Sequence, residues 1–418
     1  MQHVTIVGGG VIGLSTAWEL RQRGAEVTVL DAREPGTAAS AVNAGWVSPS
    51  LAGPVPAPGL IQQSFKWMLD PASPLYIRPR LEPSFLVWLY RFWRSCNESK
   101  YMPALEATAR LGQETLADMD RWVSQGVEFE MHDYGLLFAF RDLDEMEKEL
   151  KAFETVIPYG FERPTPWLGD DLREQEPVFG KEVLGGYMVK EERTVQPVSL
   201  VKGLINALEK SGVELRAGSP VVDIDVSGGR VVAVRTPTER IETQHVMIAA
   251  GAWTRQVAKL AGAKVPIEPG KGYGLDFRPK PVSPRSSLYL HEDRVAVSPF
   301  DGGLRLSGTM ELSGITERFT QRRINAIHKA GQKLLNGFPQ DAKPAHVWTG
   351  MRPMAPDGIP VLGKVSGFSN LTVATGHAML GVTLAAVTGV NMAELITTGK
   401  TPDILKPFDP ARFNGILL

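Results

Sequence analysis

The chain has 418 residues and a net charge of −1, with 45 Lys and Arg against 46 Asp and Glu. This balance disfavours nucleic-acid binding, which usually shows a basic excess. The single cysteine, Cys96, excludes an internal disulfide and a cysteine-rich metal site, and we expect no bound metal. No basic segment followed by an apolar stretch and a cleavage site opens the sequence, so we expect no signal peptide and a cytoplasmic protein. The 42 glycines, about 10% of the chain against an average near 7%, indicate backbone that turns tightly or approaches a ligand.

The first thirty residues predict a nucleotide-binding βαβ unit. A strand over 3–7 leads into GGGVIG at 8–13, an amphipathic helix follows, and a second strand over 26–30 ends on Asp31. The run matches GxGxxG between a strand and a helix, which is the context the motif requires. Its glycines allow the turn, the close approach of a pyrophosphate and tight packing of helix against strand. We expect the helix N-terminus to bind phosphates and Asp31 to accept from a ribose hydroxyl.

Further elements follow in chain order. Residues 35–60 are expected to form a loop, and residues 60–125 combine helical periodicity with many aromatic side chains. After a mixed region, the patterns predict helices over 198–211, 320–336 and 382–397, a hairpin over 221–235, strands over 245–249 and 371–375, and a strand-rich region over 270–310. This order predicts a doubly wound sheet that the chain enters three times, with other material inserted between the visits.

The regular alternation of strand and helix stops after Asp31. A nicotinamide-dependent dehydrogenase normally continues with further βαβ units at this point. The long insertion instead favours a larger flavin nucleotide that distant segments of the chain contact.

Seven runs of residues are more specific than these patterns. They are 8–13, 40–45 (SAVNAG), 66–68 (KWM), 74–78 (PLYIR), 271–273 (KGY), 348–358 (WTGMRPMAPDG) and 376–384 (GHAMLGVTL). Through them the chain resembles, over essentially its whole length, the D-amino-acid dehydrogenase group of the D-amino-acid oxidase/glycine oxidase superfamily of FAD enzymes. The resemblance implies an α/β fold with an FAD-binding Rossmann-like domain of the glutathione-reductase type and an interleaved α+β substrate domain built on an antiparallel sheet. The FAD-binding domain would take 1–52, 191–266 and 345–418, and the substrate domain 53–190 and 267–344.

The resemblance also implies where FAD binds. Loop 40–45 would lie against the diphosphate and isoalloxazine with Asn43 as a polar contact, Val222 would contact the adenine through its backbone, and 376–383 would place N–H groups at the N1–C2=O edge of the flavin. The expected cofactor contacts are Gly8, Gly10, Val11, Ile12, Gly13, Asp31, Ala32, Ser40, Asn43, Ala44, Gly45, Trp46, Val222, Ala250, Gly251, Gly376, Leu380, Gly381, Val382 and Thr383. We expect non-covalent FAD, because Cys96 lies in the aromatic helical insertion.

Three residues are candidates for contact with an amino-acid substrate. Arg352 matches the family's carboxylate-binding arginine, and a guanidinium can meet a carboxylate with two parallel hydrogen bonds. The alternative for Arg352 is a surface ion pair. Tyr273 is either a second contact to the carboxylate or amine, through its hydroxyl, or a packing residue of a strand. His377, beside the flavin by resemblance, is either catalytic or a hydrogen-bonded core residue.

The function implied is the FAD-dependent oxidative deamination of D-amino acids, including proline-like ones. A hydride would pass from Cα to flavin N5, the imino acid would hydrolyse to a 2-oxo acid and ammonia, and a quinone-type acceptor would take the electrons. Two alternatives stay open: an oxygen-using amine oxidase of the glycine or sarcosine type, and a non-catalytic FAD-binding subunit of an electron-transfer complex.

The segment 80–95 is apolar and aromatic with a basic rim. Interfacial helices have this composition, and a surface for the inner face of the cell membrane is one interpretation. Core packing or a subunit contact is the alternative.

Overall fold

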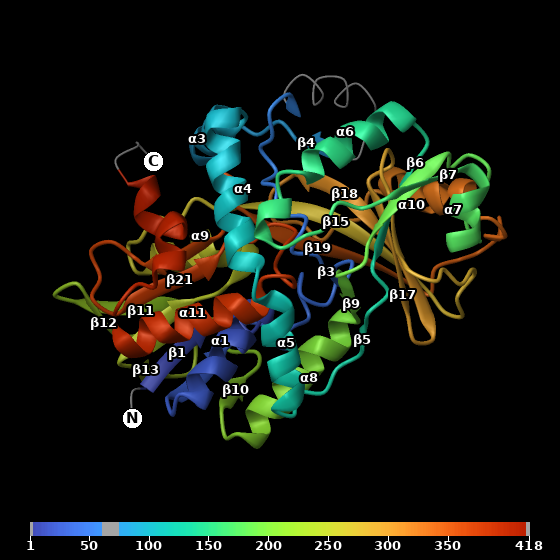
Figure 1. The fold of residues 1–418 in the computed structure, drawn as a ribbon. Coiled ribbons are helices and arrows are strands. Elements are labelled where there is room, and N and C mark those ends of the chain that lie inside the picture. The colour runs from blue at the N-terminus through green and yellow to red at the C-terminus, as the bar shows by residue number, and fades with distance from the viewer. Residues whose placement is uncertain (1–2, 61–74, 415–418) are drawn as a thin grey trace.

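The computed structural model describes residues 3–60 and 75–414, and its elements form two large sheets with helices around them (Figure 1). One of the runs used above, 66–68, and the first residue of another, 74–78, lie outside the described residues.

The first sheet has six strands in the order β10-β2-β1-β14-β21-β20, parallel except for β20. Its strands are β1 (His3–Val7), β2 (Glu26–Leu30), β10 (Glu214–Arg216), β14 (His245–Ile248), β20 (Val361–Lys364) and β21 (Leu371–Thr375). Most of their residues are apolar and buried, because both faces of the sheet are covered. The chain enters this sheet three times, as the sequence predicts.

One face of the six-stranded sheet is covered by three long helices, which lie together in Figure 1 and share one apolar core. They are α1 (Val11–Gln22), α8 (Pro197–Lys210) and α11 (Ala385–Thr398). The opposite face carries a second core, formed with α9 (Thr254–Leu260) and with the small sheet of β11 (Asp223–Ser227), β12 (Arg230–Arg235) and β13 (Arg240–Glu242). The carboxyl ends of the parallel strands and the N-termini of the helices that follow them therefore lie at the same edge of the six-stranded sheet.

The second sheet has nine strands and is mostly antiparallel, in the order β19-β15-β18-β17-β16-β6-β8-β7 with β4 paired to β18. The strands are β4 (Leu75–Ile77), β6 (Leu136–Phe140), β7 (Pro166–Leu168), β8 (Gly185–Val189), β15 (Glu268–Phe277), β16 (Ser287–Leu290), β17 (Val295–Phe300), β18 (Gly303–Leu312) and β19 (His346–Met354). Helix α10 (Gln321–Leu334) packs on β15 and β18. The predicted fold class is confirmed.

The remaining elements of the described residues connect these layers. They are helices α3 (Pro83–Ser95), α4 (Glu98–Gly112), α5 (Thr115–Ser124), α6 (Leu143–Phe153) and α7 (Gly169–Gln175), a small sheet of β3 (Trp46–Val47), β9 (Arg193–Val195) and β5 (Met131–His132), and four 3₁₀ helices at Ile157–Tyr159, Gly251–Trp253, Asp403–Phe408 and Pro410–Phe413. Within the aromatic segment 60–125, residues 83–124 are thus largely helical, as the periodicity predicts, and 75–77 form β4.

One domain boundary differs from the sheet pairing. The predicted FAD-binding segment 345–418 includes β19, but β19 pairs with β15 along its whole length in the antiparallel sheet. Residues 346–354 therefore belong to the nine-stranded sheet, and the chain returns to the six-stranded sheet only at β20. The strand pattern of 346–354 carries no signal for which of two sheets it joins.

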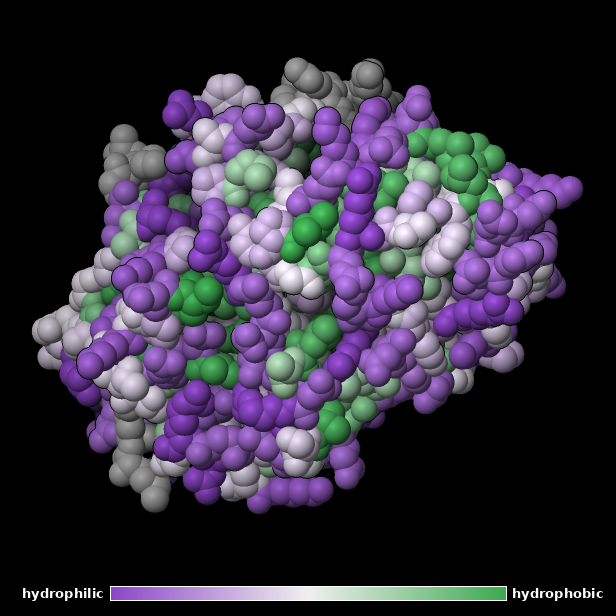
Figure 2. Space-filling model, viewed as in Figure 1, coloured by the Kyte–Doolittle hydropathy of each residue, from purple (hydrophilic) through white to green (hydrophobic). Residues whose placement is uncertain are grey.

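The face shown in Figure 2 is mostly hydrophilic, with apolar residues in separate small patches, one of them over β6, β7 and α7. Within the ranges 3–60 and 75–414, no helix combines the length and the apolar character needed to cross a bilayer.

Candidate active site

A cavity of about 1640 Å³ lies between the two sheets and receives residues from both of them. All three candidate substrate contacts line it, and so do the expected cofactor contacts other than Gly13, Val222 and Gly376. The fold therefore brings residues as far apart in the chain as Gly8 and Thr383, 375 positions, onto the walls of one space.

The first wall is the N-terminus of α1. The N–H of Val11 donates to Ser40 Oγ at 2.9 Å, whereas the N–H groups of Gly10, Ile12 and Gly13 have no acceptor within the described chain. A side chain at Gly13 would place its Cβ 2.0 Å from the carbonyl oxygen of Gly8, so this glycine serves packing and does not line the cavity. Free N–H groups at a helix N-terminus form an anion site suited to a diphosphate.

Asp31 stands at the end of β2 beside the same helix. Its Oδ2 accepts from the N–H of Gly9 at 2.7 Å and its Oδ1 from the N–H of Arg33 at 2.8 Å. Burial raises the pKa of Asp31, and the two backbone hydrogen bonds oppose that shift. Each carboxylate oxygen keeps a free lone pair, so Asp31 can accept from a ribose hydroxyl as the motif implies.

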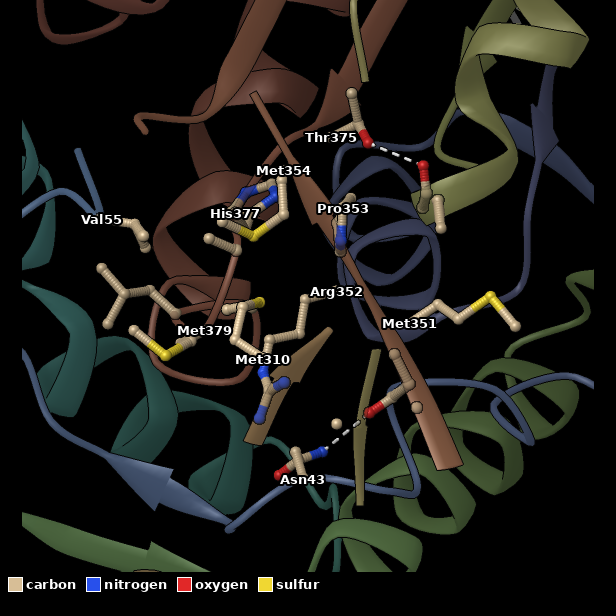
Figure 3. Close-up of a pocket in the computed structure, with 18 of the residues that line it drawn as sticks. Asn43, Val55, Met310, Met351, Arg352, Pro353, Met354, Thr375, His377 and Met379 are labelled. Carbon is tan, nitrogen blue, oxygen red and sulfur yellow. Dashed lines mark hydrogen bonds between the residues drawn. The ribbon is translucent and has the colours of Figure 1, made fainter. Parts of the chain in front are cut away.

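The loop 38–46 forms a second wall, and the side chain of Asn43, an expected cofactor contact, is hydrogen-bonded within this loop. Its amide nitrogen donates to the carbonyls of Ala39 at 3.2 Å and Ser40 at 2.7 Å, and its Oδ1 accepts from the N–H of Gly45 at 2.7 Å. Figure 3 shows the Asn43 side chain turned to its own loop. The polar groups of Asn43 thus hold the loop in shape, and Gly45, with φ +77°, completes the turn.

The third wall is the approach to α11. The N–H groups of Gly381, Val382 and Thr383 find no acceptor in the described part of the chain, and they precede the positive end of α11. The Thr383 hydroxyl donates to the carbonyl of Trp46 at 3.2 Å and accepts from the N–H of Ser48 at 3.1 Å, so this wall is bonded to the loop of the second. Gly376, with φ +79°, makes the turn behind the wall.

The segment that contains Val222, the expected adenine contact, borders the cavity. Val222 does not line the cavity, and its N–H already donates to the carbonyl of Arg235 at 2.8 Å. Residues 219–221 line the cavity instead, together with Ala32, Ala250 and Gly251. The hairpin of β11 and β12 sets this register, and the sequence pattern did not show where its pairing begins.

Arg352 carries an unneutralised positive charge into the cavity. It lies on β19, its Nη1 donates to the carbonyl of Thr309 at 2.9 Å, and no carboxylate of the described residues forms an ion pair with it. Figure 3 shows its guanidinium pointing into the space bordered by Met310, Met379 and Asn43. Burial lowers the pKa of Arg352 to about 10, so it stays cationic at neutral pH. The surface ion pair is excluded, and a cation in such surroundings requires an anionic partner.

Gly272 on β15 makes room for this arginine. A Cβ at Gly272 would lie 2.3 Å from Arg352 Nη1, whereas a Cβ at Gly274, two residues along the same strand face, would meet no atom closer than 3.8 Å. The guanidinium of Arg352 therefore crosses β15 over a glycine to reach Thr309 on β18.

We expect Gly272→Ala to raise the substrate KM about tenfold with little change in FAD content. The methyl group displaces the end of a flexible side chain and so costs substrate contact rather than folding, at about the value of one charge-assisted hydrogen bond. Steady-state kinetics and the flavin absorbance per chain measure both quantities. Gly274→Ala is the matched control, and an equal rise in KM in both variants would contradict this role of Gly272.

Tyr273 and His377 line the cavity but have partners in the protein. The Tyr273 hydroxyl donates to Glu311 Oε2 at 3.0 Å, and Lys271 Nζ lies 3.2 Å from Glu311 Oε1. His377 Nε2 lies 3.1 Å from Thr388 Oγ1, while its Nδ1 is buried without a partner in the described chain. Burial lowers the pKa of His377 to about 3, so the imidazole is neutral. Tyr273 is thus part of a buried ionic cluster, and His377 offers one neutral ring nitrogen.

Two groups near the cavity carry no sequence motif. Arg305 is 2% exposed, and it joins Asp276 to the carbonyls of Ala41 and Asn43 in the loop 38–46. Glu192 is 1% exposed, behind the segment that follows the same loop. The sequence could have pointed to Arg305 only as an arginine inside the apolar strand 303–312, and to Glu192 only as an acid before β9. The partners of both residues lie far away in the chain, so neither role could be predicted.

The walls fit FAD on the evidence of this structure. Two sets of N–H groups without acceptors in the described chain, at the starts of α1 and α11, face one extended cavity. Asp31, directly after β2, adds a hydrogen-bond acceptor to the same cavity. An extended dinucleotide with a diphosphate in the middle and an electron-rich ring edge at one end matches this distribution.

The comparisons with known proteins agree with this geometry. Residues 3–395 match the FAD dependent oxidoreductase family, DAO. D-amino acid dehydrogenase of Vibrio cholerae is 29% identical over 413 residues, with 96% of each chain covered. Glycine oxidase from Geobacillus kaustophilus has a TM-score of 0.77 at 21% identity, covering 99% of this chain and 100% of that one. L-proline dehydrogenase from P. horikoshii has a TM-score of 0.76 at 19% identity, covering 99% and 97%. Because the family match extends over nearly the whole sequence, this chain belongs to the FAD-dependent oxidoreductases of the DAO family.

Proposed function

We propose that the protein is an FAD-dependent dehydrogenase of D-amino acids, including proline-like ones. The observation that carries the proposal is Arg352, a half-buried cation that has no ion-pair partner among the described residues and lies in the same cavity as the expected FAD-binding walls. The relative from Vibrio cholerae is named for activity on D-amino acids. A substrate carboxylate would give Arg352 the ion-pair partner that it lacks among the described residues.

The cofactor would be held by the residues described above. The N-terminus of α1 would bind the diphosphate, Asp31 the ribose, residues 219–221 the adenine and the N–H groups of 381–383 the anionic edge of the ring. When bound, FAD supplies a hydride acceptor for the Cα–H bond of the substrate.

The residues of the chain orient the substrate and exclude water. Arg352 fixes the carboxylate by two parallel hydrogen bonds, which restricts the direction of the Cα–H bond. Met310, Met354 and Met379 border the same space and keep it apolar. The neutral His377 adds no charge that would compete for the carboxylate. The imino acid released would hydrolyse to a 2-oxo acid and ammonia, and a quinone-type acceptor would take the electrons.

Anaerobic reduction of the bound flavin by a panel of D- and L-amino acids, with glycine and sarcosine, tests the proposal. Bleaching by D-amino acids supports it, bleaching only by glycine or sarcosine favours the oxidase, and no bleaching by any of them favours a non-catalytic subunit. Comparison of peroxide formation with the reduction of a quinone analogue identifies the class of acceptor.

FAD is expected to leave the protein on acid precipitation and give a colourless pellet. Burial raises the pKa of the Cys96 thiol to about 11, the thiol donates to the carbonyl of Phe92 at 3.3 Å, and Cys96 does not line the cavity. A protonated thiol away from the ring cannot act as the nucleophile for attachment. Yellow colour that stays with the pellet would contradict this expectation.

We also propose that α3 and the residues before it contact a membrane surface. Leu81 is 93% exposed, and Tyr90 and Trp93 are more than half exposed, all of them on the rim of the cavity. Trp88, in contrast, is buried and donates from Nε1 to the carbonyl of Met354 at 3.1 Å, so it belongs to the core. This face would lie on the inner side of the cell membrane, where an apolar electron acceptor is available.

Trp93→Glu is expected to reduce co-sedimentation with anionic liposomes several-fold without changing flavin content, because a charge replaces an apolar anchor. Val123→Glu, at an exposed apolar residue of α5, is the control. Equal binding of wild type and Trp93→Glu would contradict the membrane contact.

A further inference from the structure

A polar niche with unpartnered atoms lies directly behind one wall of the cavity. Glu192 is 1% exposed, and its Oε1 accepts from the N–H of Ser50 at 3.1 Å. Its Oε2, together with the hydroxyls of Ser48 and Ser50, is buried without a hydrogen-bond partner of normal geometry within the described residues. Buried polar atoms of this kind are normally paired to protein or water, so three of them facing one another need an explanation.

The niche is connected to the cavity by the two serines. Ser48 and Ser50 line the cavity, whereas Glu192 does not. The N–H of Ser48 donates to Thr383 Oγ1 at 3.1 Å, which ties this segment to the wall expected at the flavin edge. The pairing of Val47 with Arg193 in β3 and β9 places Ser48 and Glu192 at the next position of the same ladder. The carboxyl group is therefore one hydroxyl away from the space that substrate and cofactor would share.

The protonation of Glu192 is balanced near neutral pH. Burial raises the pKa of its carboxyl to about 7, against the lowering effect of the Ser50 and Ser48 hydroxyls, and the charge of Glu191 raises it further. Arg193 turns away to Asp133 at 2.8 Å, so it does not neutralise Glu192. Tyr101 of α4, which faces Gly53, has its pKa raised by burial and stays neutral, as does His377 across the cavity.

We propose that Glu192, acting through Ser48 and Ser50, accepts the proton that the substrate ammonium group must lose before its Cα–H bond can be oxidised. This inference rests on the proposed function, because it needs an amine substrate. The N–H bond of the ammonium breaks, its proton moves to a serine hydroxyl, and the proton of that hydroxyl moves to Glu192 Oε2. The amine keeps its electron pair, and no other reactant is consumed. Glu192 itself contacts neither the substrate nor the flavin ring. It acts on the substrate only through the serine hydroxyls, to which it offers an acceptor for the proton.

The direction of the pH dependence follows from this assignment. Glu192 can accept a proton only when it is ionised, so the apparent rate constant of flavin reduction at low substrate should rise through about pH 7 and then level off. Glu192→Gln keeps the shape and removes the acceptor. It should lose the rise centred near pH 7 and lower the rate at pH 8 about 100-fold, the lower end of the range for general base catalysis.

Stopped-flow reduction of the holoenzyme between pH 5.5 and 9 is the test, with Glu191→Gln as the matched control. Glu191 is exposed, so its variant should keep the rise but shift it slightly to lower pH, because one charge that raises the pKa of Glu192 is gone. A second readout is thermal unfolding. A carboxyl whose pKa is raised in the folded state stabilises the fold at low pH and loses that contribution as pH rises through about 7. The Tm of the wild type should therefore fall relative to that of Glu192→Gln as the pH rises from 5.5 to about 7, and the difference should then stay constant.

The pH profiles of the variants decide whether Glu192 accepts the proton. A wild-type pH profile in Glu192→Gln would overturn the proposal. If that variant does not fold or hold FAD, the double variant Ser48→Ala with Ser50→Ala decides, since it breaks the relay and leaves the carboxyl in place. Loss of the rise near pH 7 in the double variant supports the proposal, and an unchanged profile overturns it. If no amine bleaches the wild-type flavin, the proposed function itself fails, which the wild-type enzyme alone reveals.

Discussion

Arg352→Lys is expected to raise the substrate KM by about 10- to 150-fold, the value of one lost charge-assisted hydrogen bond of about 1.5–3 kcal/mol. A guanidinium can donate to both oxygens of a carboxylate, and it still has an N–H for the carbonyl of Thr309. An ammonium group on a shorter side chain is a point charge and cannot keep this geometry. Steady-state kinetics with the amino acid that reduces the flavin fastest gives the KM.

The effect should grow with pH. The same burial that lowers the pKa of Arg352 to about 10 would act on a lysine whose ordinary pKa is about 10.4, and the lysine would lose its charge in the weakly alkaline range. Arg110→Lys, at an exposed i,i+4 pair with Glu106, is the control and should leave KM unchanged. Wild-type KM in Arg352→Lys at pH 9 would remove Arg352 from the substrate site.

The sequence predicted best what depends on residues close together in the chain. The strands predicted over 3–7 and 26–30 have these limits in the structure, and the glycine turn and helix α1 lie between them as predicted. The arginine at 352 was found through a run of eleven residues that resembles a family. In both cases the function could be predicted because the residues of the motif follow one another in the sequence.

Side-chain partners could not be predicted in the same way. Asn43 and Tyr273 do line the cavity, but their hydrogen bonds go to the loop backbone and to Glu311, 38 positions away. The sheet membership of 346–354 depends on a register between β15 and β19 that no local pattern records. The unpartnered atoms around Glu192 have no motif at all, because an absence of partners is visible only after folding.

Arg305→Met is expected to yield a protein with little bound FAD, although Arg305 belongs to the antiparallel sheet and not to the nucleotide-binding one. Its Nε and Nη2 meet both oxygens of Asp276 at 2.6 and 2.9 Å, and its Nη1 donates to the carbonyls of Ala41 and Asn43, each at 2.9 Å. Two further bonds hold the same assembly: Trp348 Nε1 donates to Asp276 at 2.8 Å, and Ser298 Oγ donates to the carbonyl of Ala44 at 2.6 Å. The loop 38–46 is therefore held by side chains of the nine-stranded sheet.

Arg305→Met does two things that a second variant can separate. It leaves Asp276 as a buried charge without its cation, which costs about 3–5 kcal/mol of folding free energy, and it frees the two loop carbonyls. Adding Asp276→Asn removes the uncompensated charge, so thermal unfolding should return most of the way to wild type. FAD affinity should not return, because no donor reaches the carbonyls of Ala41 and Asn43. Titration of the apoprotein with FAD, followed by fluorescence, measures this. If affinity recovers together with stability, Arg305 serves the fold alone. If it stays at least about 150-fold weaker, as two lost bonds of about 1.5–3 kcal/mol each imply, the nine-stranded sheet directly shapes the cofactor site.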